Sequence, residues 1–104
     1  MVDVYHNSDF LNYTIRIFSN KEIKSIPENL LTKVATVNTD ILEQAYCLTN
    51  SIEGHWSENE NVFCFKENAR STSMGDVFVR EGVWYMVMDC GFKRIERESV
   101  TTSK

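Results

Sequence analysis

The stretch ARSTSMGDVFVREGVWYMVMDCGFKRI, residues 69–95, decides the fold. Glu81-Gly82 is a turn dipeptide between two apolar runs, a pattern typical of a β-hairpin. One side of such a hairpin carries two facing pairs, Val77 with Met86 and Val79 with Trp84. The other side carries Phe78, Tyr85 and Val87. Because both sides are apolar, we expect the hairpin to be covered on both faces or rolled into a small barrel.

The rest of the chain adds further strands and one helix. Strand composition recurs at residues 2–4, 30–37, 62–65 and 92–96. In YTIRIF, residues 13–18, apolar and polar side chains alternate, which predicts a half-buried strand. DILEQAYCLTN, residues 40–50, has helical apolar spacing, and Asp40-x-x-Glu43 resembles a capping box. The sum is an α+β fold: a curved antiparallel sheet of about five strands, or a partly open barrel, with one main helix across it.

Length and composition indicate one cytoplasmic domain. We expect the 104 residues to form a single α+β domain over residues 1–98, with a disordered tail at 99–104. No apolar run approaches the ~20 residues of a membrane helix, and the start lacks the features of a signal peptide. The cysteines, Cys47, Cys64 and Cys90, form no C-x-x-C motif and are expected to be reduced.

The segment before the hairpin is the first candidate binding site. Its hydroxyls, backbone amides and arginine suit an anion such as phosphate or carboxylate. The residues concerned are Arg70, Ser71, Thr72, Ser73 and Asp76. The alternative is structural: the hydroxyls cap a turn, Gly75 supplies a positive φ, and Asp76 accepts amide hydrogen bonds.

The acidic loop SIEGHWSENEN contains the second candidate. His55 is a potential base or metal ligand, but the other histidine, His6, lies 49 residues away, so we predict no metal and no cofactor. Trp56 either covers the core or anchors a protein partner. No paired catalytic set is visible, which favours a non-enzymatic protein. An enzyme remains an alternative if His55, a cysteine and a carboxylate converge in one pocket.

Nucleic-acid binding is a further alternative. Strand aromatics flanked by Arg70, Lys93 and Arg94 would suit a base-stacking surface. The net charge of −4 and the pI of about 5.1 lack the basic character of most nucleic-acid-binding domains.

Residues 69–95 also resemble a known signature. The pattern R-S-x-S-x-G-D-V, then Y-x-V and G-F, resembles the C-terminal signature of small phage and mobile-element proteins, including the YodL-like group. The resemblance covers residues 33–95, and Arg70, Ser71, Ser73, Gly75 and Asp76 match it. Members are functionally largely uncharacterised, and some accompany anti-restriction genes. The resemblance implies an accessory protein that binds and disables a host factor.

The sequence therefore predicts a non-enzymatic, phage-type accessory protein in the host cytoplasm. It would bind and modulate or inhibit a host protein, for instance a defence or nucleic-acid enzyme. We expect no membrane association, and a homodimer is left open.

Overall fold

The computed structural model describes residues 1–50, 61–65 and 70–98. It contains two α-helices, α1 (Phe10–Phe18) and α2 (Leu42–Thr49), and a 3-10 turn, η1 (Glu28–Leu30). The strands are β1 (Val2–Asn7), β2 (Ser25–Pro27), β3 (Leu31–Val37), β4 (Val62–Cys64), β5 (Val77–Arg80), β6 (Val83–Val87) and β7 (Phe92–Glu98).

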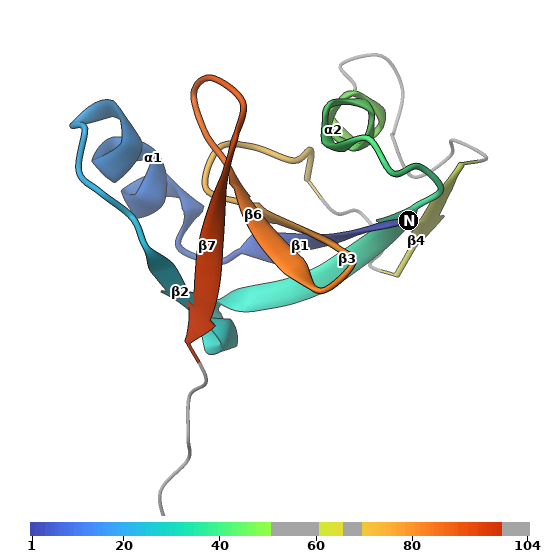
Figure 1. Ribbon diagram of the computed structural model, residues 1–104, viewed down its shortest axis with the longest axis horizontal. Coiled ribbons are helices and arrows are strands. Elements are labelled where there is room, and N and C mark those ends of the chain that lie inside the picture. Colours follow the sequence, from blue (N-terminus) through green and yellow to red (C-terminus); the bar gives the residue numbers. More distant parts are fainter. Residues whose placement is uncertain (51–60, 66–69, 99–104) are drawn as a thin grey trace, which may run out of the picture.

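The seven described strands form one sheet. The sheet is strongly curled (Figure 1). The order is β2-β7-β6-β5-β1-β3-β4, and only the β2–β7 pair is parallel. A bulge in β3, where Ala35 pairs with Val4 but Lys33 pairs with Tyr5, adds local twist. The predicted α+β class and curvature are confirmed. The sheet is nevertheless mixed rather than antiparallel, and it has seven strands rather than about five.

The β5–β6 hairpin has the predicted register. Val77 pairs with Met86, and Val79 pairs with Trp84. The turn residue Glu81 has a φ of 51°, and the following Gly82 has a φ of 78°. Two positive φ values are the signature of the hairpin turn whose twist matches that of the strands.

Two hydrophobic clusters lie on opposite faces of the sheet. Neighbouring residues of one strand separate between them: Val77 belongs to the cluster that includes α1, and Phe78 belongs to the cluster that includes α2. The helices therefore cover different faces (Figure 1). The prediction of one main helix was incomplete, because the sheet is apolar on both faces and each face needs a cover.

Helix α1 corrects the prediction of a strand at residues 13–18. Tyr13 and Ile17 are buried, but Ile15, which period two would bury with them, is 61% exposed. The spacing of the buried pair is therefore one helical turn. The β-propensity of these residues is overridden by tertiary packing, because a helix here buries the apolar face of the sheet.

The predicted capping box of α2 does not form. Helix α2 begins at Leu42, and its N-cap residue Ile41 makes no side-chain cap hydrogen bond. The Thr39 hydroxyl accepts a hydrogen bond from the Ile41 N–H at 3.1 Å, just before the helix. Asp40 instead accepts a hydrogen bond from the N-terminal ammonium group of Met1 at 2.6 Å. That ammonium group, assisted by the more distant Arg80, lowers the pKa of the exposed Asp40 carboxyl below its usual value.

The turn at Glu81 gives a first prediction. Replacing Glu81, which has a positive φ, with Asn should raise the free energy of unfolding by about 0.5–1 kcal/mol, because Asn-Gly suits this turn. For a domain of this size, Tm should rise by about 3–6 °C in a thermal melt. Glu81→Ala is the matched control, since it removes the same charge but keeps the strained backbone. Equal Tm values for the two variants would contradict the prediction.

Candidate functional site

Asp76 is the centre of a buried polar cluster. Its side chain is fully buried just before β5. Oδ1 accepts hydrogen bonds from the backbone N–H of Asn7 at 2.8 Å and from Arg70 Nη2 at 2.7 Å. Oδ2 accepts from Arg70 Nη1 at 2.7 Å and from the Ser73 N–H at 2.8 Å. A carboxylate offers about four acceptor positions, so these bonds occupy the acceptor capacity that a substrate or cation would need.

Arg70 is the charge partner that makes this burial tolerable. It forms a bidentate pair with Asp76, and it also donates to the carbonyl oxygens of Ser71 and Asn7 at 3.0 and 3.2 Å. Its guanidinium carbon lies 3.8 Å from the centroid of the Phe10 ring, a cation–π contact. A buried carboxylate without such a partner would be strongly destabilising. Arg70 is therefore engaged within the protein.

Asn7 and His6, at the end of β1, complete the cluster. The Asn7 amide nitrogen donates to the Gly75 carbonyl oxygen at 3.0 Å, and its amide oxygen accepts from the Asp9 N–H at 2.8 Å. His6 Nε2 lies 3.2 Å from the Thr72 hydroxyl and 4.0 Å from Asp76 Oδ2. Because His6 is only 6% exposed, this His–Asp pair is closed to a substrate.

The cluster also holds α1 against the sheet. The Thr14 hydroxyl donates to the Met74 carbonyl oxygen at 3.2 Å. Gly75 has a φ of +89°, and an added Cβ would lie 3.1 Å from both the Phe10 carbonyl oxygen and the Tyr13 Cβ. Only glycine permits this approach with this backbone conformation. Residues 70–76, hereafter the 70–76 turn, thus form a socket for the first turns of α1.

The same turn connects to the other face of the fold. The Thr72 N–H donates to the Thr49 carbonyl oxygen at the end of α2, at 2.9 Å. The Gly75 N–H donates to the Val87 carbonyl oxygen, and the Val87 N–H donates to the backbone carbonyl oxygen of Asp76, both at 2.9 Å. The turn therefore links both helices to the central strands.

The docked helix exposes an apolar face. Leu11, Ile15 and Phe18 are 66%, 61% and 62% exposed. At 3.6 residues per turn they lie on one side of α1, opposite the buried Tyr13 and Ile17. Single exposed apolar residues are common, but three on one helical stripe form a contiguous patch. We call these three residues the α1 outer stripe.

Of the residues predicted to bind a ligand or partner, the structure brings five together in the 70–76 turn. Thr72 and Asp76 are buried, and Arg70, Ser71 and Ser73 are half-buried around them. The positive φ of Gly75 and the amide hydrogen bonds that Asp76 accepts are the two features that the structural alternative for this segment requires of these residues. His55 and Trp56 lie outside the described residues.

The predicted aromatic surface is divided between the two faces. Tyr85 and Phe92 pack with the α2 cluster, and Phe92 lies 5.6 Å from Phe78. Trp84 lies on the α1 side, in an aromatic–basic row that runs across several strands. Successive contacts in the row join Arg97 to Trp84 at 5.4 Å, Trp84 to Tyr5 at 5.2 Å, and Lys33 to Phe65 at 5.3 Å; Lys33 pairs with Tyr5 across β1 and β3.

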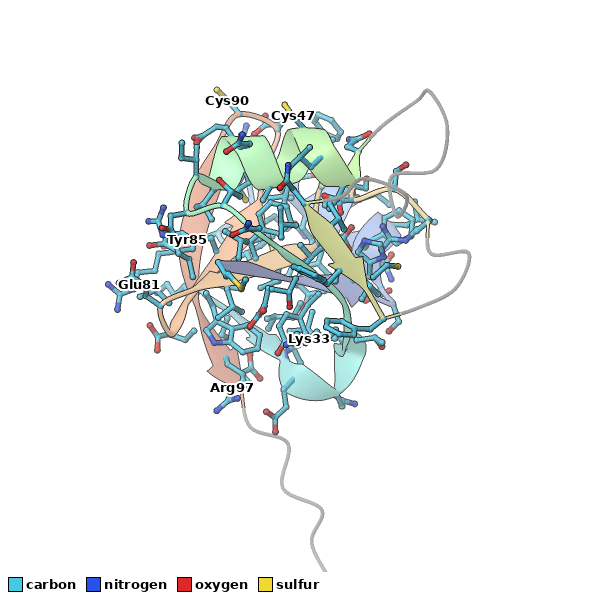
Figure 2. All side chains as sticks on the ribbon, turned by 90° about the vertical axis from the view of Figure 1, so that its right-hand side faces the viewer. Lys33, Cys47, Glu81, Tyr85, Cys90 and Arg97 are labelled. Atoms are coloured by element: carbon cyan, nitrogen blue, oxygen red, sulfur yellow. The ribbon has the colours of Figure 1, made fainter. Side chains whose placement is uncertain are left out.

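Two of the thiols, those of Cys47 and Cys90, lie away from this row. None of the three cysteines forms a disulfide bond, and Figure 2 shows Cys47 and Cys90 at one end of the molecule with Lys33 and Arg97 toward the other. Cys47 is exposed, on the outer side of α2. It borders an open depression of about 260 Å³ whose described lining includes Glu43 and Asp89 but no histidine. That lining supplies no imidazole base to activate the thiol.

Within residues 1–50, 61–65 and 70–98, no three His, Cys, Asp or Glu side chains gather as potential metal ligands. No helix in that part of the chain is long and apolar enough to cross a membrane. Comparison with protein-family models, curated proteins and solved structures finds no match for this chain. The assignment of a site therefore depends on the geometry of the chain itself.

The α1 outer stripe is the feature that sequence reasoning missed. The strand prediction for residues 13–18 divided the helix and hid its pattern. The signal was nevertheless present in the sequence. Leu11, Ile15 and Phe18 are spaced by four and three residues, and the buried Tyr13 and Ile17 are spaced by four, which are helical intervals.

The socket gives a second prediction. Gly75→Ala should lower the free energy of unfolding by about 2–4 kcal/mol, because the added methyl is strained and also displaces α1. Gly82→Ala is a matched control: its φ is also positive, but nothing lies within 4 Å of its added Cβ. This control should lose only about 1–2 kcal/mol. Urea unfolding measures both values, and amide hydrogen exchange should be faster in α1 for Gly75→Ala alone. Equal losses would contradict the socket.

Proposed function

We propose that this protein is a small accessory protein of phage or mobile-element type that binds a host protein and modulates or inhibits it. It acts in the host cytoplasm without catalysing a reaction, and a defence or nucleic-acid enzyme is the kind of target that its resemblance suggests. The observation that carries the proposal is the α1 outer stripe. Leu11, Ile15 and Phe18 leave more than half of their surface in water and add nothing to the core.

Several features of the site support binding rather than catalysis. The Asp76 carboxylate is saturated by internal donors, and His6 is buried beside it. The described polar groups around them hold α1 in place instead of facing an open pocket. An exposed apolar ridge on a well-anchored helix is a common form of protein-recognition element.

Affinity capture tests this proposal. Immobilised protein should retain one bacterial protein at about a 1:1 ratio, and Ile15→Glu should reduce the retained amount at least tenfold, because it places a charge in an apolar interface. Ile41→Glu is the control, since Ile41 is 56% exposed but lies next to α2. Trp56→Ala is a second arm that examines the loop. Absence of any stoichiometric protein would remove the proposal.

A second candidate function, single-stranded nucleic-acid binding, is favoured by the aromatic–basic row. Stacking of bases on Trp84, Tyr5 and Phe65 beside two cations would resemble known single-strand surfaces. The cations are partly neutralised, however: Lys33 lies 3.5 Å from Asp3, and Arg97 lies 3.5 Å from Glu28. This neutralisation, together with the net charge of −4, places the candidate second.

Salt dependence tests the second candidate. It predicts that a fluorescent oligo-dT strand binds at ~50 mM salt, and that affinity falls steeply with added salt as counterions are released. Trp84→Ala should weaken binding about fivefold to a hundredfold through lost stacking. Arg94→Ala, on the opposite side of β7, is the control. Fluorescence anisotropy without any change at ~50 mM salt would eliminate this candidate.

A further inference from the structure

The α1 outer stripe is a narrow ridge. Leu11, Ile15 and Phe18 extend along ~10 Å of the helix axis, at 1.5 Å per residue. Helical ligands enter hydrophobic grooves through anchors at this kind of spacing, i, i+4 and i+7. We propose that α1 inserts into an apolar groove of the partner protein, and that the groove has an acidic rim at the end that receives Phe18. This inference rests on the proposed function.

The exposed area argues against a second copy of this chain as the occupant. The three side chains, each nearly two-thirds exposed, offer roughly 400 Å², about half of the ~800 Å² that each partner contributes to a stable interface. Two convex ridges in contact would bury little beyond these side chains. A concave groove also covers the flanks of the helix, including the exposed Asn12 and the half-buried Arg16. The missing area is therefore supplied by a partner that encloses α1.

The charges near the stripe define the rim. Residues 10–27 contain three basic residues and one acidic residue, although the whole chain has a net charge of −4. Lys24 and Glu22 lie 3.9 Å apart and largely cancel. This leaves a positive surplus from Arg16 and from the exposed Lys21, which follows the C-terminal end of α1 and donates its N–H to the Arg16 carbonyl oxygen at 3.0 Å. Acidic groups on the facing rim would favour association and fix the direction of the helix.

A lipid surface would also accept an apolar stripe with basic neighbours. The stripe offers only three apolar side chains for insertion among the lipids, and the surplus of positive charge near it is only two residues. The hydrophobic and the electrostatic contributions to membrane binding are therefore both small. The net charge of −4 opposes approach to an anionic membrane. The observations therefore favour a protein groove.

Site-specific photocrosslinking of the full chain tests this inference. A photoreactive amino acid at position 15 should give one major adduct in bacterial lysate, and the same group at position 41 should not. The crosslinked partner peptide, identified by mass spectrometry, should be rich in apolar residues with Asp or Glu nearby. With that partner purified, Ile15→Ala and Phe18→Ala should each weaken binding at least tenfold. Lys21→Glu should weaken it severalfold, and this difference should shrink in high salt. Ile41→Ala should bind normally.

The remaining outcomes overturn the inference in different ways. If a partner is captured but binds Ile15→Ala and Phe18→Ala normally, the groove is wrong and the proposed function stands. If no partner is captured, both fail. Sedimentation at ~500 µM that shows a dimer abolished by Ile15→Glu would assign the stripe to a second copy, given the small area available. Flotation with phosphatidylglycerol vesicles, lost in the same variant, would assign it to a lipid surface. Circular dichroism confirms that each variant is folded.

Discussion

The buried carboxylate of Asp76 is the constraint on which the rest of the structure depends. A fully buried charge is tolerated only when it is paired and hydrogen-bonded, and Asp76 meets both conditions through Arg70, Asn7 and Ser73. These partners come from the end of β1 and from the 70–76 turn, so pairing brings the two segments together. Arg70 then covers Phe10. The polar cluster consequently determines where α1 begins and how it lies on the sheet.

The local parts of the fold were predictable from the sequence. The β5–β6 hairpin could be predicted down to its facing pairs, because a turn dipeptide and the flanking apolar runs act within about ten residues. Helix α1 could not, because its fate depends on Gly75 and Arg70, some sixty residues further along the chain. Judged locally, YTIRIF has the β-branched and aromatic composition of a strand. Tertiary contacts reverse that preference.

The anion-binding chemistry of the candidate site was predictable, but whether the anion is part of the protein or a ligand was not. By sequence, Arg70 and the backbone amides of a tight turn suit an anion. In the structure Arg70 and the Ser73 N–H do hold a carboxylate, and that carboxylate is Asp76 of the same turn. Sequence pattern alone cannot distinguish an internal anion from an external one, because both require the same donors at the same spacing.

The buried polar cluster and the exposed apolar stripe explain each other physically. A buried ion pair seldom stabilises a protein more than well-packed apolar residues would. What this ion pair and its hydrogen bonds contribute is a specific orientation of the groups that they join. Tyr13 and Ile17 alone would let α1 slide or rotate on the sheet, whereas hydrogen bonds and the close approach at Gly75 permit one placement. A ridge that binds by three side chains loses affinity if the helix must first be ordered, because that entropy is subtracted from the binding free energy. Because the polar socket already orders α1, this loss of entropy does not arise on binding. Leu11, Ile15 and Phe18 are therefore exposed in an arrangement that is ready to bind.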